Sequence, residues 1–162
     1  MIVEPLLKHH WPSVKTIYEE GLATGVATFE TLAPSWAKWH KDHLSFARLV
    51  AILDDIVVGF AALSPVSQRK VYRGVAEVSI YIATNQRGKG VGKMLLNQLI
   101  QDSEDNNIWM LQASIFPENP ASVALHESCG FRIVGKRKKI GKRLGKWYDN
   151  LLLERRSKKI GI

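Results

Sequence analysis

The stretch NQRGKGVGKMLL, residues 85–96, constrains the fold of this chain most strongly, because its three glycines separate two different hydrophobic periods. Before it, GVAEVSIYIAT (74–84) alternates apolar and polar side chains, which predicts a β-strand. After it, apolar residues recur at three-and-four spacing, which predicts a helix of about three to four turns beginning near Gly90. The sequence therefore predicts a strand, a glycine-rich loop and a helix in direct succession.

The glycine-rich loop has the properties of an anion-binding site. The first NH groups of a helix have no partner within the helix, and the helix dipole makes that end electropositive. Glycines let a phosphate approach the main chain and permit positive φ angles. Arg87, Lys89 and Lys93 add positive charge at the rim of the loop. We therefore predict that the loop binds a pyrophosphate.

The rest of the chain consists of short segments with strand or helix patterns, without repeats or a long linker. Alternating or β-rich segments predict strands at 2–10, 48–65 (a hairpin that ends at Pro65), 108–116, 131–139 and 146–155. Helical spacing and capping residues predict helices at 11–24, 33–45 and 118–131. We therefore expect residues 1–162 to form one mixed α/β (α+β) domain.

The cysteine content and the hydropathy restrict the environment of the protein. Cys129 is the single cysteine, so an internal disulfide is excluded and a buried structural thiol is expected. No apolar run reaches membrane-spanning length, and Glu4 and Pro5 interrupt the segment in which a signal peptide would be apolar. We expect a cytoplasmic protein that does not associate with a membrane. We also expect no metal, because His40 and His43 share a helix face without a third ligand.

The net charge of +8 comes from the C-terminal part of the chain. Residues 1–131 contain 11 Lys and Arg against 13 Asp and Glu, whereas residues 132–162 contain 12 against 2. Such a segment can bind nucleic acid or another polyanion, or it can form a solvated hairpin. We favour the hairpin over nucleic acid, because aromatic residues for base stacking are absent from 135–147 until Trp147.

The spacing of the glycines distinguishes three known phosphate-loop patterns. The Walker pattern needs four residues between its first glycine and Gly-Lys-Ser/Thr, but Gly88 and Gly92 enclose only three. The dinucleotide pattern G-x-G-x-x-G, begun at Gly88, needs a glycine where Lys93 stands. The pattern Q/R-x-x-G-x-G/A is met by Arg87, Gly90 and Gly92. In this respect the loop resembles the pyrophosphate loop of the GNAT superfamily of acetyl-CoA-dependent N-acetyltransferases.

Other segments extend this resemblance over nearly the whole chain. ATFET (27–31), YRGVAEVSIYI (72–82), NPASVALHESCGF (119–131) and VGKRKKIGKRLGKWYDNLLLER (134–155) resemble the GNAT branch of phosphinothricin and methionine sulfoximine N-acetyltransferases. The resemblance implies the GNAT fold, in which a central, splayed, mixed sheet holds acetyl-CoA at the splay, and it implies a homodimer.

The resemblance also implies which residues bind acetyl-CoA. Main-chain NH groups at Ile80, Tyr81 and Ile82 would hold the thioester oxygen where the strand diverges, unless they take part in ordinary strand pairing. Asn119 would contact the pantetheine arm or only cap its helix, and Ser122 lies on the same helix face. The pyrophosphate would bind the loop and the first helical turn, at Arg87, Gly88, Lys89, Gly90, Val91, Gly92 and Lys93.

Two side chains are candidates for proton transfer. Acetylation needs a neutral amine, and Glu77 is the only acid in the strand 74–84 and therefore the candidate base. The alternative for Glu77 is an exposed strand carboxylate paired with Arg or Lys. The resemblance gives a catalytic part to His126, which could donate a proton to the departing thiolate or serve in the base relay. The alternative for His126 is a polar residue on the helix surface.

The acceptor site is expected to recognise an amino acid. Arg69 and Arg73 could bind the α-carboxylate, although solvated loop charges are the alternative. In the related branch the positions of Phe29 and Glu30 form a wall of the acceptor pocket, and Tyr72 lies near that pocket. A core phenylalanine is the alternative for Phe29.

Three interpretations of function follow. The first is an enzyme that transfers acetyl from acetyl-CoA to the α-amine of phosphinothricin, methionine sulfoximine or methionine sulfone. The second keeps acetyl-CoA but has another acceptor, such as a polyamine, another amino acid or a protein amine. The third is a basic nucleic-acid-binding module with a vestigial acyl-CoA site, against which Arg87, Gly90, Gly92 and Glu77 argue together.

Overall fold

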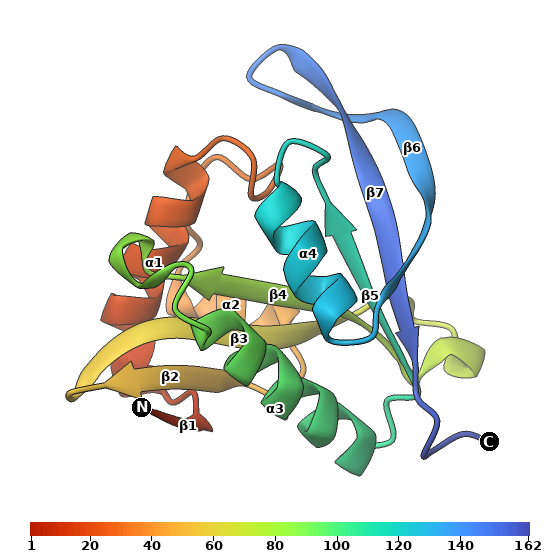
Figure 1. The fold of residues 1–162 in the computed structure, drawn as a ribbon, viewed down its shortest axis with the longest axis horizontal. Helices are drawn as coiled ribbons and strands as arrows, with labels where there is room; N and C mark the ends of the chain where they lie inside the picture. Colours follow the sequence, from red (N-terminus) through yellow and green to blue (C-terminus); the bar gives the residue numbers. More distant parts are fainter.

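The computed structural model describes residues 1–162 and consists of a seven-stranded sheet with four α-helices (Figure 1). The strand order is β1-β2-β3-β4-β5-β7-β6, and only β4 and β5 are parallel neighbours. The strands are β1 (Ile2–Pro5), β2 (Leu49–Leu53), β3 (Ile56–Pro65), β4 (Val75–Ile82), β5 (Met110–Ile115), β6 (Arg132–Arg143) and β7 (Lys146–Arg156). The helices are α1 (Trp11–Ala23), α2 (Trp36–Asp42), α3 (Val91–Asp105) and α4 (Pro120–Ser128). This arrangement confirms the predicted mixed α/β class.

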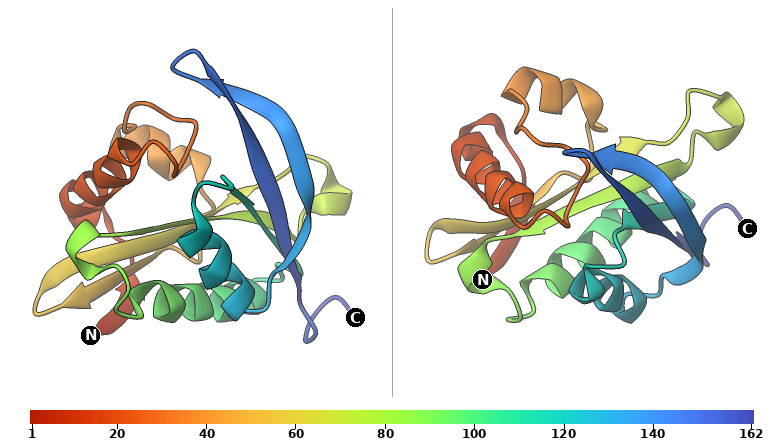
Figure 2. Two further views of the ribbon diagram at one scale, coloured as in Figure 1. Left: turned by 45° about the horizontal axis from the view of Figure 1, so that its top comes forward. Right: turned by 90° about the horizontal axis from the view of Figure 1, so that it is seen from above.

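The helices cover both faces of the sheet, and each face has its own apolar cluster (Figure 2). On one face α3 inserts Leu95, Leu96 and Leu99, all fully buried, against strand residues such as Leu63 and Leu111. On the other face α1 and α2 pack against Phe60 of β3. Both clusters anchor the central strands, so β3 and β4 form a rigid base for any site built at their ends.

Two predicted strands have other bounds in the structure. The strand expected at 2–10 ends at Pro5, and a 3₁₀ turn (Lys8–His10) follows, in which the NH of Leu7 donates to Nδ1 of His10 over 3.1 Å. The strand expected at 131–139 continues to Arg143, because its pairing with β7 resumes at Gly141 after an irregularity.

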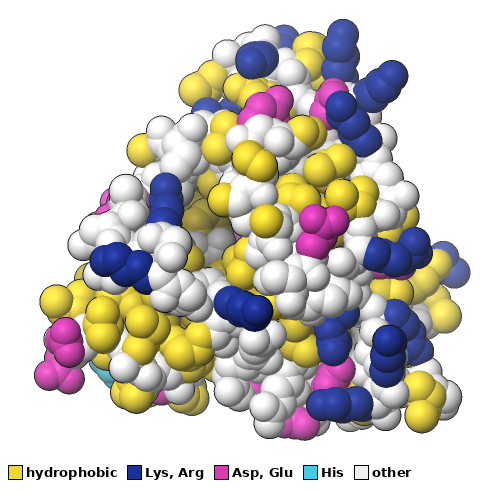
Figure 3. All heavy atoms as spheres, viewed as in Figure 1, with side chains coloured by type: hydrophobic (Ala, Val, Ile, Leu, Met, Phe, Trp, Pro, Cys, Tyr) yellow, Lys and Arg dark blue, Asp and Glu magenta, His cyan; other side chains and the backbone are white.

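The basic segment forms a hairpin of β6 and β7, as predicted from the sequence. The hairpin projects beyond the rest of the sheet (Figure 1), and its Lys and Arg side chains point outward along one side of the molecule (Figure 3). Cys129 is buried, as predicted. None of the helices is long and apolar enough to cross a membrane.

Candidate active site

The central opening of the molecule lies where β4 and β5 separate. The two strands pair only at Val75, Ala76 and Glu77 of β4. Beyond Glu77, β4 stays paired with β3 as far as Ile82 but has no partner on its β5 side. The main-chain NH and carbonyl groups on that edge of β4 therefore have no hydrogen-bond partner in a neighbouring strand. This is the splay that the resemblance predicted.

The glycine-rich loop begins directly after β4 and has the backbone that its glycines predict. Gly88 and Gly90 have φ angles of +74° and +84°, and a Cβ atom at either position would meet nothing within 4 Å. The first intrahelical bond of α3 runs from the NH of Met94 to the carbonyl of Gly90, over 3.1 Å. The earlier NH groups of the helix therefore face the loop without a helical partner.

A cavity of about 540 Å³ extends from the glycine-rich loop to the splay. Its wall is formed by α1, β4, the glycine-rich loop and α4. Ten residues predicted to bind the cofactor line it: Ile80, Tyr81, Ile82, Arg87, Gly88, Gly90, Gly92, Lys93, Asn119 and Ser122. The other two do not line it. Lys89 is exposed, and the side chain of Val91 is only 1% exposed within the core, so Val91 has only its main chain to offer.

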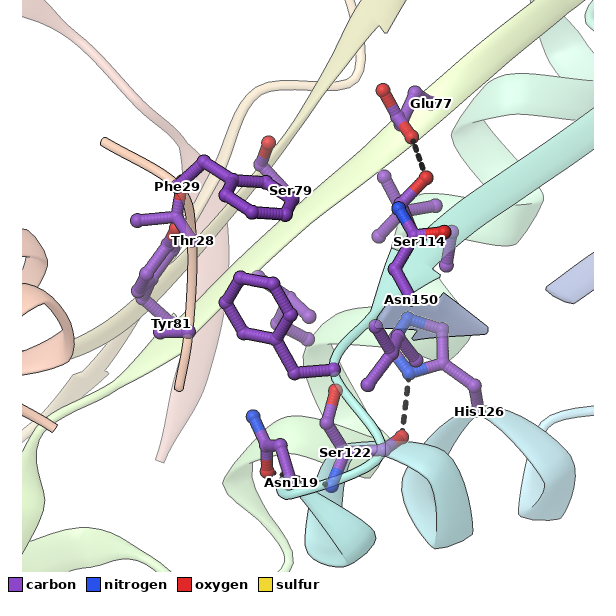
Figure 4. A pocket seen from close by; sticks show the side chains of 16 residues that line it. Thr28, Phe29, Glu77, Ser79, Tyr81, Ser114, Asn119, Ser122, His126 and Asn150 are labelled. Atoms are coloured by element: carbon purple, nitrogen blue, oxygen red, sulfur yellow. Dashed lines mark hydrogen bonds between the residues drawn. The ribbon is translucent and has the colours of Figure 1, made fainter. Parts of the chain in front are cut away.

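A second cavity, of about 220 Å³, adjoins the first and contains both predicted catalytic residues (Figure 4). Glu77 and His126 line it together with Phe29, so the structure brings these three together from β4, α4 and the segment after α1. The two cavities share five lining residues, namely Ala27, Ile80, Tyr81, Asn119 and Ser122. The cavity that contains Glu77 therefore adjoins the cavity at the glycine-rich loop.

The carboxylate of Glu77 is held by a hydroxyl group and not by a cation. The hydroxyl of Ser114 on β5 donates to Oε1 of Glu77 over 2.8 Å, and no Lys, Arg or His nitrogen lies within ion-pair distance of this carboxylate (Figure 4). The alternative of a strand carboxylate paired with Arg or Lys is therefore wrong. Glu77 is left with a negative charge that a ligand can approach.

His126 is buried, so the alternative of a surface residue is wrong. It is 2% exposed, and its Nδ1 lies 2.7 Å from the carbonyl oxygen of Ser122. Its Nε2 is buried without any hydrogen-bond partner. Burial lowers the pKa of His126, although the bond to the Ser122 carbonyl acts in the opposite direction. His126 therefore stays neutral near pH 7.

Asn119 caps α4, as predicted. Its side-chain oxygen accepts from the NH of Ser122 over 3.3 Å, and its Nδ2 donates to the carbonyl of Val26 over 3.5 Å. The amide therefore joins α4 to the segment after α1, at the junction of the two cavities.

The residues predicted for the acceptor site are divided between different places. Phe29 lies on the wall of the smaller cavity with its ring edge-on to Phe116, at a centroid distance of 4.7 Å. Glu30 lines a neighbouring cavity of about 450 Å³ instead. Arg69, Tyr72 and Arg73 line no cavity within the single chain, because they belong to a 3₁₀ turn before β4.

Residues 10–131 match the model of the acetyltransferase (GNAT) family. The match covers three quarters of the chain, including the splayed strands and the glycine-rich loop. The chain belongs to the GNAT family. The predicted fold and the predicted acetyltransferase class are thereby confirmed.

Curated relatives and a solved structure refine the position of the chain within the GNAT family. It is 33% identical to phosphinothricin N-acetyltransferase of Alcaligenes faecalis, over 89% of this chain and 76% of the relative. It is 36% identical to L-methionine sulfoximine/L-methionine sulfone acetyltransferase of Pseudomonas aeruginosa, over 85% of this chain and 84% of the relative. A phosphinothricin acetyltransferase of Sinorhizobium meliloti, solved with AcCoA, superimposes with a TM-score of 0.87 at 31% identity, covering 96% of this chain and 87% of that one.

Sequence reasoning missed two polar residues of this GNAT site, Ser114 and Asn150. Ser114 lies two residues beyond Gln112, the partner of Glu77 in the β4–β5 register, so period-two alternation puts it on the same face. Asn150 is a buried polar residue on β7 that lines the smaller cavity. Only the strand order, with β7 beside β5, brings Asn150 to the cavity.

Proposed function

We propose that this GNAT enzyme transfers acetyl from acetyl-CoA to the α-amine of a small amino acid analogue, with phosphinothricin, methionine sulfoximine or methionine sulfone as the acceptor class. The observation that carries the proposal is the carboxylate of Glu77, which has no cationic partner and lies at the start of the splay, in a cavity that adjoins the one at the glycine-rich loop. The names of the relatives supply the acceptor class.

The shape of the glycine-rich loop fits a pyrophosphate. Gly88 and Gly90 leave the space over their α-carbons empty, which brings the NH groups of the first helical turn within reach of phosphate oxygens. Arg87, Lys89 and Lys93 add positive charge beside them. Acetyl-CoA, when bound, supplies an acetyl group activated as a thioester. On the free edge of β4 the NH groups of Ile80 and Ile82 would be offered to the thioester oxygen, whereas the NH of Tyr81, like that of Ala83, points to β3. Asn119 and Ser122 would border the pantetheine arm.

Glu77 acts in this proposal as the base that takes a proton from the ammonium group of the acceptor. Its second oxygen is free of Ser114, so it can accept the proton directly or through water. The acceptor amine then attacks as the neutral form, which is the only form with a lone pair.

His126 fits a base relay better than a proton donor. Its Nδ1 must carry the proton, because the carbonyl of Ser122 can only accept. Since burial keeps the ring neutral, Nε2 has a bare lone pair in the wall of the cavity. Because Nε2 is itself buried, a water or an amine NH can reach this lone pair only when the wall of the cavity moves, and His126 would then receive a proton.

The acceptor would lie in the smaller cavity, with Phe29 beside its side chain. Arg69, Tyr72 and Arg73 lie at the 3₁₀ turn before β4, outside the smaller cavity, and would take part if a second copy of the chain brings them to it. Exposed apolar residues on the β6–β7 hairpin, including Ile133, Ile140 and Trp147, support a homodimer. Light scattering on the purified protein would test it, and a monomer at micromolar concentration would contradict it.

We place this single-domain enzyme in the cytoplasm, where acetyl-CoA is made in bacteria such as those of its relatives. Fractionation of the cells that express it would test this location.

A thiol-release assay with acetyl-CoA tests the proposed function. The panel contains phosphinothricin, methionine sulfoximine, methionine sulfone, spermidine, unmodified amino acids and a peptide with a free amino terminus. We expect turnover of at least one of the first three. Turnover confined to spermidine or the peptide would contradict the acceptor class, and thiol release from none would contradict the activity.

A further inference from the structure

We propose that Arg137 of β6 binds the α-carboxylate of the acceptor, and that Asn150 and Ser114 position its guanidinium group. This inference rests on the proposed function and identifies the group that selects amino acids over other amines. It replaces Arg69 and Arg73 as the carboxylate-binding residues within one chain.

The guanidinium group of Arg137 lies behind the wall of the smaller cavity, where two residues of that wall hold it. Its Nε donates to Oδ1 of Asn150 over 2.9 Å, and its Nη2 donates to Oγ of Ser114 over 3.2 Å. Both partners line the cavity. A guanidinium has five NH groups, so most of those on Arg137 are still available to a ligand after these two bonds.

Arg137 differs from the other cations of the hairpin because it has no anionic partner. Arg132 pairs with Glu154, and Lys136 pairs with Asp149. No carboxylate oxygen lies within ion-pair distance of Arg137. Arg143 on the same strand donates to main-chain carbonyls outside the cavity. Arg137 is therefore a cation that two lining residues of the cavity position, and it has no ion-pair partner within the chain.

The position of Arg137 relative to Glu77 matches the shape of an α-amino acid. In such a molecule the amine and the carboxylate are attached to the same carbon, so their receptors must be neighbours. The Ser114 hydroxyl alone stands between the two groups, since it donates to Glu77 and accepts from Arg137. An acceptor with its ammonium at Glu77 would have its carboxylate near the planar guanidinium, which binds carboxylates with two parallel bonds.

The test compares L-methionine sulfone with 3-(methylsulfonyl)propan-1-amine, the same molecule without the carboxylate. The readout is the ratio of kcat/KM for the amino acid to kcat/KM for the amine. We expect Arg137→Gln to lower this ratio about 10- to 100-fold, because it removes a charged hydrogen-bond partner from the carboxylate. Most of the loss should appear in KM for the amino acid. Arg137→Lys should keep part of the ratio, because the charge remains while the planar fork is lost.

Lys138→Gln is the matched control, because it removes the same charge from an exposed neighbour on β6 that donates no side-chain hydrogen bond within the chain. It should leave the ratio unchanged. Calorimetric titration with L-methionine sulfone in the presence of CoA gives the same comparison without turnover. Thermal melting verifies that each variant is folded. If Arg137→Gln is not folded, the kcat/KM ratio of Arg137→Lys tests the inference in its place.

Each outcome bears on a different claim. One outcome is that the wild-type protein acetylates L-methionine sulfone while Arg137→Gln changes kcat/KM by the same factor for the amino acid and the amine, or changes neither value. In that case this inference fails while the proposed function stands. If the wild-type protein acetylates only the amine, or neither molecule nor any other amino acid of the panel, the proposed function fails, and this inference fails with it.

Discussion

The hydroxyl of Ser114 donates to the carboxylate of Glu77 over 2.8 Å across the point where β4 and β5 separate. The bond joins the last paired residue of β4 to a residue of β5 beyond the pairing. It therefore fixes the direction of the carboxylate at the mouth of the splay, where an incoming amine must lose its proton. Both residues are next to an alanine, Ala76 or Ala113, that is buried in the same apolar cluster as α3.

Replacing Glu77 with Gln should reduce kcat by about 10²- to 10⁴-fold, because the amide keeps the size of the side chain but cannot take a proton. The affinity for acetyl-CoA should change little, since Glu77 does not line the larger cavity. Steady-state kinetics with calorimetric titration of acetyl-CoA measure the two effects. An equal loss in both would make Glu77 a structural carboxylate.

Replacing Ser114 with Ala should lower kcat by about tenfold, because the carboxylate of Glu77 loses the hydrogen bond that orients it. Ser103→Ala is a matched control, since its hydroxyl donates to the carbonyl of Ile100 within α3 and it lines no cavity. Steady-state rates with the best acceptor measure the effect. If both variants keep the rate of the wild-type protein, the bond does not assist the reaction.

Replacing Gly90 with Ala should destabilise the protein by about 1 kcal/mol, because φ is +84° and an L-residue is strained there. The affinity for acetyl-CoA should also fall, because relief of the strain rotates the NH groups of the loop. Gly135→Ala is the control, since a Cβ there meets nothing within 4 Å and its φ is not positive. Thermal melting with and without acetyl-CoA distinguishes the effects, and identical shifts for both variants would contradict a special role of Gly90.

Acidification should destabilise the protein through His43, which is half-buried, and His126, which is buried. Burial lowers the pKa of His43 and of His126 below the value of 6.5 that they have in the unfolded chain. As the pH falls through 6.5, the unfolded chain binds protons that the folded protein does not, so the free energy of unfolding decreases until the lower folded pKa values are reached. Melting temperatures between pH 7.5 and 5.5 should decrease, and less so for the variant with both histidines replaced by Gln. An equal decrease in that variant would assign the effect to other groups.

The elements of the fold could be predicted where the local pattern decides them. The change of period at Gly90, the cap at Asn119 and the alternation around Glu77 are local signals, and each led to the observed element. The bounds of β1 and β6 could not be predicted, because the turn at His10 and the resumed pairing at Gly141 depend on contacts that no local pattern contains.

The sequence predicted site residues both at the motif and far from it. Glu77 and the glycine-rich loop are close in sequence, and the family resemblance added Phe29, Asn119 and His126, which also line the cavities. Ser114 and Asn150 come to the cavity through strand order and register, and β7 lies between β5 and β6 although it follows both in the chain. A single sequence gives no register for such a non-local strand. The structure therefore added the acceptor side of the site.

The last strand of the chain, β7, lies between two strands that are synthesised before it, which has a consequence for the nascent chain on the ribosome. The glycine-rich loop and α4 are synthesised before β7, whereas Asn150 emerges with the last strand and completes the gap beside β5. A partly made chain therefore lacks Asn150, and the edge of β5 that pairs with β7 stays bare until translation is nearly finished.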